Sequence, residues 1–136
     1  MQASLFKKNA VLVEQNPMHC RLYGDLLEAN GFDVYIAKSV MDALVKIREQ
    51  NQDLALINME IVEEKFIQKF IQNIKSEDCS KDMTLIGISI YPEEKKKNIA
   101  KFVDSFLTKP FSLDKLTESI DQCIERNNDT EGVNYQ

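Results

Sequence analysis

Five short apolar runs, rich in β-branched side chains, recur along the chain. They cover residues 10–13, 34–37, 54–57, 85–88 and 105–107. A run that is apolar throughout is typical of a strand buried on both faces, as in a parallel sheet covered by helices. The pattern therefore predicts five buried strands in a parallel sheet.

Between these runs, apolar residues recur with the three- and four-residue spacing of an amphipathic helix. The first helical stripe ends at Asn30 and Gly31, a pair typical of a helix C-terminus. Ser39 is a suitable N-cap for the second stripe. The stripes are Met18, Leu22, Leu26 and Leu27; Val40, Leu44 and Ile47; Phe66, Ile67, Phe70, Ile71 and Ile74; Ile99, Phe102 and Val103; and Leu113, Leu116, Ile120, Cys123 and Ile124.

Strands and helices thus alternate along the whole chain. This order predicts an α/β fold of (βα)5 type with an open, doubly wound parallel sheet. After Arg126 the sequence NNDTEGVNYQ has no apolar periodicity. We therefore expect one domain over residues 1–126 and a flexible C-terminal tail over residues 127–136.

Composition excludes several classes of function. The net charge of −5 argues against nucleic-acid binding, which needs a basic face. Cys20, Cys79 and Cys123 lack metal-ligand spacing, and His19 is the single histidine, so we expect free thiols rather than a zinc site. No apolar stretch reaches the roughly 18 residues of a membrane span, and no signal-peptide pattern is present. We expect a cytoplasmic protein that contacts no membrane.

Polar residues follow four of the predicted strands. In open α/β sheets, ligands bind at the carboxyl ends of the strands. The residues to consider there are 14–16, 58–60, 89–91 and 108–110. We expect these four segments to converge on one site, although the rule does not say what chemistry the site performs.

The same four segments resemble response-regulator receiver domains. They read VLVEQN, DLALINME, GISIYPEE and FLTKPF, and the similarity extends over about residues 8–125. The stretch RLYGDLLEANGFDV is similar to single-domain, DivK-like regulators. The resemblance implies a CheY-like, flavodoxin-type sheet with strand order 2-1-3-4-5.

The resemblance also implies a chemistry. In the family, three carboxylates hold Mg²⁺, and one of them is the nucleophile that takes a phosphoryl group from a phosphohistidine. A lysine pairs with the new phosphate, and a Ser/Thr hydroxyl moves to bond it. The matching positions here are the acidic-pocket residues Glu14 and Gln15, the phosphoacceptor-equivalent Asn58, the switch residues Ser89 and Phe106, and the lysine Lys109.

The sequence departs from the family pattern at the site itself. Asn58 carries an amide, which is a poor nucleophile, and Gln15 replaces one of the paired acids. Only Glu14 remains of three carboxylates, so we expect Mg²⁺ binding there to be weak at most and no other cofactor. The loop EIVEEKF lacks the usual Pro and Gly, and the short segment between Ser89 and Lys109 predicts a trimmed fourth helix.

Several of these residues also have a purely structural interpretation. Lys109 could be an ordinary surface lysine, or it could bond Glu14 and Asn58 simply to satisfy the fold. Ser89 could be a vestigial hydroxyl, and His19 is interpreted as a surface imidazole. The lysine run at 95–97 is typical of a solvated helix face.

The leading hypothesis is an atypical receiver, or pseudo-receiver, that binds partner proteins in two-component, phosphorelay or cell-cycle signalling and is not an enzyme. Its partner would be a histidine kinase, a phosphotransferase or a downstream effector. The expected docking face runs from Glu93 to Val103, includes Phe106, and continues from Leu113 to Glu125. A conventional phosphoacceptor remains open, if Asn58 was engineered from Asp or if Glu60 accepts the phosphoryl group. A flavodoxin-like cofactor binder is the third alternative.

Overall fold

The five predicted strands form one parallel sheet in a computed structural model of the chain. The structure describes the backbone of residues 8–80 and 82–134, and the side chains of these residues except Cys79 and those after Cys123. The strands are β1 (Lys8–Val13), β2 (Phe32–Ala37), β3 (Leu54–Asn58), β4 (Thr84–Ser89) and β5 (Ser105–Thr108). Their order is β2-β1-β3-β4-β5, and every neighbouring pair is parallel, which confirms the predicted topology.

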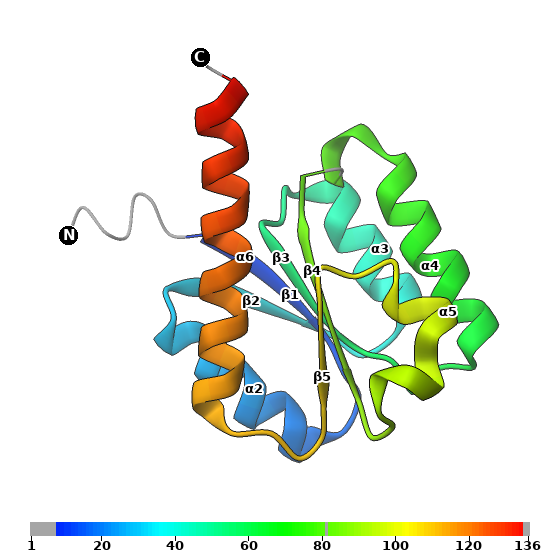
Figure 1. Cartoon of the computed structure of the whole chain (residues 1–136). Coiled ribbons are helices and arrows are strands. Elements are labelled where there is room, and N and C mark those ends of the chain that lie inside the picture. Colours follow the sequence, from blue (N-terminus) through cyan, green and yellow to red (C-terminus); the bar gives the residue numbers. More distant parts are fainter. Residues whose placement is uncertain (1–7, 81, 135–136) are drawn as a thin grey trace.

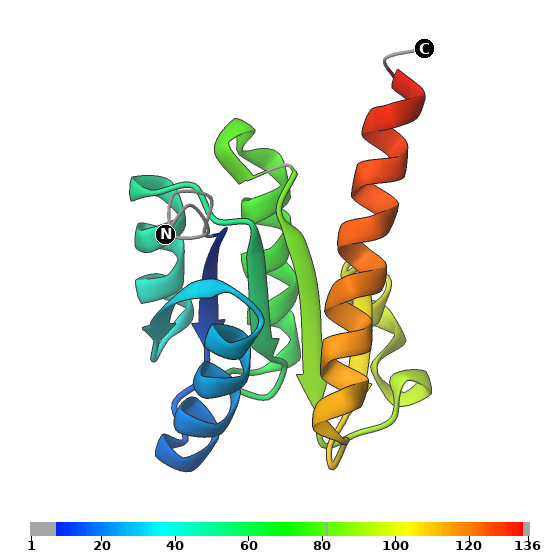
Figure 2. The ribbon, with the colours of Figure 1, turned by 90° about the vertical axis from the view of Figure 1, so that its left-hand side faces the viewer.

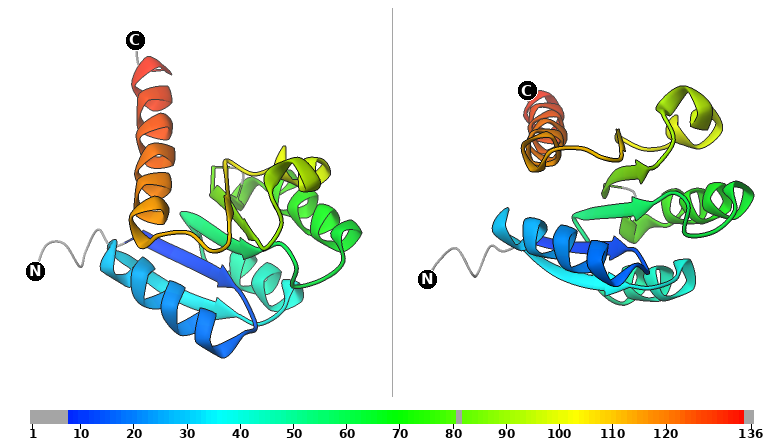
Figure 3. Two further views of the ribbon diagram at one scale, coloured as in Figure 1. Left: turned by 60° about the horizontal axis from the view of Figure 1, so that its bottom comes forward. Right: turned by 90° about the horizontal axis from the view of Figure 1, so that it is seen from below.

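Helices cover both faces of this sheet. One face carries α2 (Pro17–Ala29) and α6 (Leu113–Asn134), and the other carries α3 (Val40–Glu49), α4 (Glu64–Ser76) and α5 (Lys97–Ala100) (Figures 1 and 3). Two 3₁₀ turns, η1 (Asp78–Ser80) and η2 (Glu93–Lys96), precede β4 and α5. The arrangement is the doubly wound one that the alternation of strands and helices predicts.

The central strands supply the core because their side chains point alternately to the two faces. On β1, Val11 and Val13 face the layer of α3, α4 and α5, whereas Ala10 and Leu12 face α2 and α6. All four side chains are fully buried. Burial on both faces explains why the strands read as continuous apolar runs.

Local signals fix where the helices begin and end. The Ser39 hydroxyl accepts a hydrogen bond of 3.0 Å from the Asp42 amide, which confirms the predicted N-cap of α3. At the start of α2, Asn16 Oδ1 accepts from the His19 amide at 3.1 Å. Gly31 follows α2 with φ 92°, a left-handed conformation that glycine adopts without a Cβ clash. The cap at Asn16 places the first turn of α2 directly after β1.

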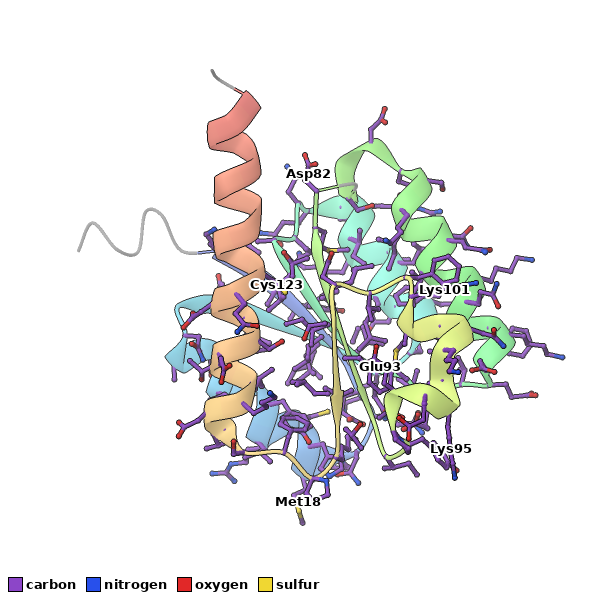
Figure 4. All side chains as sticks on the ribbon, viewed as in Figure 1. Met18, Asp82, Glu93, Lys95, Lys101 and Cys123 are labelled. Atoms are coloured by element: carbon purple, nitrogen blue, oxygen red, sulfur yellow. The ribbon has the colours of Figure 1, made fainter. Side chains whose placement is uncertain are left out.

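The face that α2 buries differs from the predicted apolar stripe. Its buried residues are Cys20, Tyr23, Gly24 and Leu27. Met18, by contrast, is 76% exposed and Leu22 is 44% exposed. Figure 4 shows Met18 pointing away from the body of the protein at the carboxyl edge of the sheet. Leu27 is fully buried and Leu26 packs against the core, so this half of the predicted stripe is confirmed. Met18 and Leu22 were wrongly included because they are more apolar than Cys20 and Gly24, which are buried in their place.

The helix α5 is unusually short, with 4 residues, and the helix α6 is unusually long, with 22 residues. The helix α5 spans only Lys97–Ala100, which confirms the trimmed fourth helix. The helix α6 continues to Asn134, past the boundary predicted at Arg126, so the described part of the predicted tail has a helical backbone. Its end extends past the amino-terminal edge of the sheet (Figure 2). Extension of an existing helix needs no new nucleus, so a polar sequence can continue it without apolar periodicity.

Candidate functional site

A pocket of about 350 Å³ lies at the carboxyl ends of the strands. It is formed by segments that follow β1, β3, β4 and β5, so the four strand ends converge as expected. Its lining residues are Glu14, Gln15, Asn16, His19, Asn58, Glu60, Ile90 and Lys109. Ser89 lies next to this pocket, where it contacts Glu60. Phe106 is not among the lining residues and packs against the core on the α3, α4 and α5 side.

Glu14 is a fully buried carboxylate at the end of β1. Its Oε2 accepts hydrogen bonds from the amides of Gln15 at 3.0 Å and Asn16 at 3.1 Å, and from Asn58 Nδ2 at 3.1 Å. Its Oε1 accepts no hydrogen bond from the described residues. Lys109 Nζ lies 3.6 Å from Oε1. The buried charge is thus stabilised by three N–H donors on one oxygen and an ammonium group near the other.

Asn58 is the last residue of β3, and both the nitrogen and the oxygen of its side-chain amide form hydrogen bonds. Its Nδ2 donates to Glu14 Oε2, and its Oδ1 accepts from the Glu60 amide at 3.1 Å. An aspartate could accept the second of these bonds but could not donate the first. The asparagine therefore fits its neighbours as a donor as well as an acceptor.

Lys109 follows β5 and turns into the pocket. Its side chain is only 12% exposed, so the ordinary surface-lysine interpretation is wrong. The Nζ atom lies 3.4 Å from His19 Nδ1 and 5.9 Å from the centre of the Tyr23 ring. Its backbone N–H donates to the Ser89 carbonyl at 2.6 Å, which holds the strand end beside β4. Lys109 approaches Glu14, as expected, but no contact with Asn58 is found among the described residues.

His19 belongs to the site, which corrects its interpretation as a surface imidazole. Its side chain is one-third exposed, and its Nδ1 lies 3.7 Å from Glu14 Oε1. The first turn of α2 brings it there, because its amide is bonded to the Asn16 cap. The imidazole therefore lies beside both the carboxylate and the Lys109 ammonium group, and the three groups are mutual neighbours.

The carboxylate of Glu60 contacts the end of β4. The Ser89 hydroxyl donates to Glu60 Oε2 at 2.6 Å, and the Ile90 amide donates to Oε1 at 2.9 Å. Lys96 Nζ lies 3.8 Å from Oε2. The sequence interpretation considered Glu60 only as an alternative phosphoryl acceptor and missed this contact. The available signal was an acid two residues beyond one strand end, opposite a hydroxyl at the neighbouring strand end.

The Glu14 charge also acts on the buried side of the pocket. Burial, and then the negative charge of Glu14, raise the pKa of the Cys20 thiol and of the Tyr23 hydroxyl. The Cys20 thiol donates to the Glu14 carbonyl oxygen at 3.3 Å. Cys20 is therefore held as a neutral, buried thiol rather than as a reactive thiolate.

The side chains around the pocket form no dense set of metal ligands. Within the described residues, no three His, Cys, Asp or Glu side chains lie together in a way that could hold a metal ion. No helix in the same part of the chain is long and apolar enough to span a bilayer.

A doubly wound sheet with an acidic residue, a hydroxyl and a lysine at its carboxyl edge defines a protein of the receiver class. Residues 10–121 match the family described as the response regulator receiver domain, and the chain belongs to this family. Membership of the family favours the receiver class over the flavodoxin-like cofactor binder that the sequence left open.

Individual relatives and solved structures agree with this assignment. The chain is 24% identical to the polar-differentiation response regulator DivK of Brucella ovis over 117 residues, covering 83% of this chain and 93% of that protein. A response regulator from Thermotoga maritima has a similar structure, with 25% identity and a TM-score of 0.75 over 88% of this chain and 98% of that chain. The receiver domain of a sensor histidine kinase from Pseudomonas aeruginosa PAO1, solved with a magnesium ion in its active-site cleft, shows the same fold at 17% identity, with a TM-score of 0.75 over 87% of this chain and 98% of that chain.

Proposed function

We propose that this receiver acts as a pseudo-receiver: a protein-interaction module of bacterial two-component or phosphorelay signalling, or of cell-cycle control, that does not pass through an aspartyl phosphate. The observation that carries the proposal is the amide of Asn58 at the phosphoacceptor-equivalent position, bonded to Glu14 and to the Glu60 backbone. An amide oxygen is a poor nucleophile, and this one already accepts a hydrogen bond. The phosphorylation step of the family has no suitable acceptor at this position.

The same geometry supports a second element of the proposal, which is weak Mg²⁺ binding. The residues present do not fit a resident Mg²⁺, because Glu14 is the only acid at the three family metal-binding positions, where Gln15 and Asn58 are uncharged. The other carboxylate that lines the pocket, Glu60, is engaged by the Ser89 hydroxyl and the Ile90 amide. One of the Glu14 oxygens is taken by three N–H donors, and the other faces the Lys109 ammonium group at 3.6 Å. A divalent cation would have to displace this ammonium group to reach Glu14, and would have to break the Ser89 and Ile90 hydrogen bonds to gain Glu60 as a second negative ligand.

The proposed partner is a signalling protein, namely a histidine kinase, a phosphotransferase or a downstream effector. Its docking face would comprise residues 93–103, Phe106 and residues 113–125. The topology supports this choice, because β5 is an edge strand and is flanked by α5 on one face of the sheet and α6 on the other. The proposal includes a cytoplasmic location, no catalytic turnover, and no role in binding nucleic acid or membrane.

Incubation with acetyl phosphate and Mg²⁺, followed by intact-mass measurement, tests this proposal. We expect no phosphate adduct on the wild-type chain. The double variant Asn58→Asp with Gln15→Asp is the matched control, since it restores two carboxylates and should take up phosphate in part. An adduct on most wild-type molecules would instead support the conventional phosphoacceptor, and peptide mapping would show whether Glu60 carries it.

A further inference from the structure

The two donors at the end of β4 are both occupied by one internal carboxylate. Ser89 Oγ lies 2.6 Å from Glu60 Oε2, and the Ile90 nitrogen lies 2.9 Å from Oε1. Lys96 Nζ is 3.8 Å from the same Oε2. A hydroxyl, a backbone N–H and an ammonium group that converge in this way form a cradle for an anion. In this chain the anion belongs to the protein itself.

We infer that Glu60 is a built-in anion that closes the Ser89 and Ile90 donors to external anions and holds the segment after β4 in a single arrangement. The inference rests on the proposed function and deepens it, because it names the residue that fixes the site without phosphorylation. Glu60 is a positioning residue in this account. It acts through Ser89 and the backbone that follows.

The number of hydrogen-bond donors explains why an external anion cannot bind at the end of β4. A serine hydroxyl has one proton to donate, and the backbone N–H of Ile90 has one as well. Both protons point to Glu60, so neither donor is left for a phosphate group. An approaching anion would also meet the like charge of the Glu60 carboxylate, which is only 22% exposed and therefore incompletely screened by water.

Tyr91 connects the Glu60–Ser89 contact to residues at the protein surface. Ser89 Oγ accepts a hydrogen bond of 3.0 Å from the Tyr91 amide, and the Tyr91 carbonyl accepts one of 3.3 Å from Thr108 Oγ1 on β5. Lys96 Nζ lies 4.8 Å from the centre of the Tyr91 ring. The Glu60 carboxylate, Tyr91 and η2 thus form one connected network at the border of the proposed docking face.

This network is expected to depend on Glu60 more than on any neutral contact. Hydrogen bonds to an ionised acceptor are stronger than neutral ones. Ser89 is fully buried, so its hydroxyl has no ready access to water when the carboxylate is removed. Loss of Glu60 should therefore release the loop rather than leave it in place.

The test uses Glu60→Ala and Glu60→Gln, with Glu63→Gln as the matched control. Glu63 is an exposed acid three positions further along, and its side chain makes no cap hydrogen bond to α4. NMR-detected amide exchange should be about ten- to a hundredfold faster at Ile90 in Glu60→Ala, as expected for loss of a hydrogen bond to a charged group. Titration with inorganic phosphate should then shift the Ile90 and Tyr91 resonances saturably in Glu60→Ala, but not in the wild type or in Glu63→Gln.

Two results would overturn the inference. Exchange at Ile90 within about twofold of the wild-type rate in both Glu60 variants would show that the carboxylate does not hold the loop, since even one charged hydrogen bond is worth more. Absence of phosphate-dependent shifts in Glu60→Ala, or equal shifts in the wild type, would show that Glu60 does not close an anion site. If Glu60→Ala does not fold, the exchange rate of Glu60→Gln decides, because glutamine keeps the shape but loses the charge and one of the two acceptor oxygens that Ser89 and Ile90 use. None of these measurements uses a phosphodonor, so their failure is distinct from an adduct in the acetyl phosphate experiment.

Discussion

Asn58 Nδ2 lies 3.1 Å from Glu14 Oε2 and donates a hydrogen bond to this fully buried carboxylate. The same oxygen accepts two backbone N–H groups. Asparagine at this position therefore does more than remove a nucleophile, because it supplies a donor to a charge that has little access to water. The amide at position 58 and the carboxylate at position 14 form one structural unit.

Replacement of Asn58 by Asp should destabilise the protein when no divalent cation is present. The variant loses the donor to Glu14 and places a second negative charge beside it, at a cost of about 1–3 kcal/mol. Thermal unfolding in the presence of a chelator measures this effect. The control is Asn98→Asp, the same change at an exposed position of α5. Equal melting temperatures for wild type and Asn58→Asp would mean that the hydrogen bond to Glu14 contributes nothing to stability.

Much of the fold could be predicted because the responsible signals are local. The strands follow from runs that are buried on both faces, and the start of α3 follows from the Ser39 cap. The convergence of the strand ends then follows from the parallel order alone. Each of these features depends on a few consecutive residues or on a general rule of sheet architecture.

The contacts within the site could not be predicted in the same way. Ser89 and Glu60 are 29 residues apart, and no periodicity or spacing indicates that their side chains meet. The place of His19 depends on the rotation of α2, which is set by packing of Tyr23 and Leu27 rather than by the more apolar-looking Met18. Long-range hydrogen bonds and helix rotation are properties of the packed structure, so they appear only once it is assembled.

Mg²⁺ binding should be weak in the wild type and should return in the double variant Asn58→Asp with Gln15→Asp. The variant restores two negative ligands beside Glu14, and these offset the competing Lys109 ammonium group. Isothermal titration of both proteins with MgCl₂ measures the difference. Sub-millimolar affinity in the wild type would show that the pocket binds Mg²⁺ without acids at positions 15 and 58, contrary to our expectation.

The Cys20 thiol should react slowly with thiol reagents in the folded protein. Burial and the Glu14 charge raise its pKa, so the folded state favours the protonated thiol. Stability from this group is present below the ordinary thiol pKa and is lost as the pH rises through the raised value. The labelling rate of Cys20, followed by peptide mass mapping, should keep rising at pH values where the rate of the urea-unfolded chain has levelled off. A plateau at the same or a lower pH than in the unfolded chain would contradict the raised pKa.

Removal of residues 127–136 should leave the melting temperature nearly unchanged. The backbone is helical as far as Asn134, but the segment has no apolar periodicity with which to bury a face against the sheet. Calorimetry of the full and shortened chains compares them directly. A decrease of about 4 °C or more, roughly 1 kcal/mol for a domain of this size, would indicate that this part of α6 packs against the domain.

Partner binding by the wild-type chain should not depend on a phosphodonor. In the family, phosphate shifts an equilibrium between two arrangements of the switch residues, whereas here Ser89 is already bonded to Glu60 and Phe106 packs against the core. One arrangement should therefore dominate and be bound constitutively. Capture of partners from lysate, with and without acetyl phosphate, should give equal amounts for the wild type. Lys101→Glu on the proposed face should reduce capture, while Lys38→Glu, at a lysine that is also exposed but follows the opposite edge strand β2, should not. A partner that is captured only by the phosphorylated Asn58→Asp and Gln15→Asp variant would show that the wild-type arrangement is the inactive one.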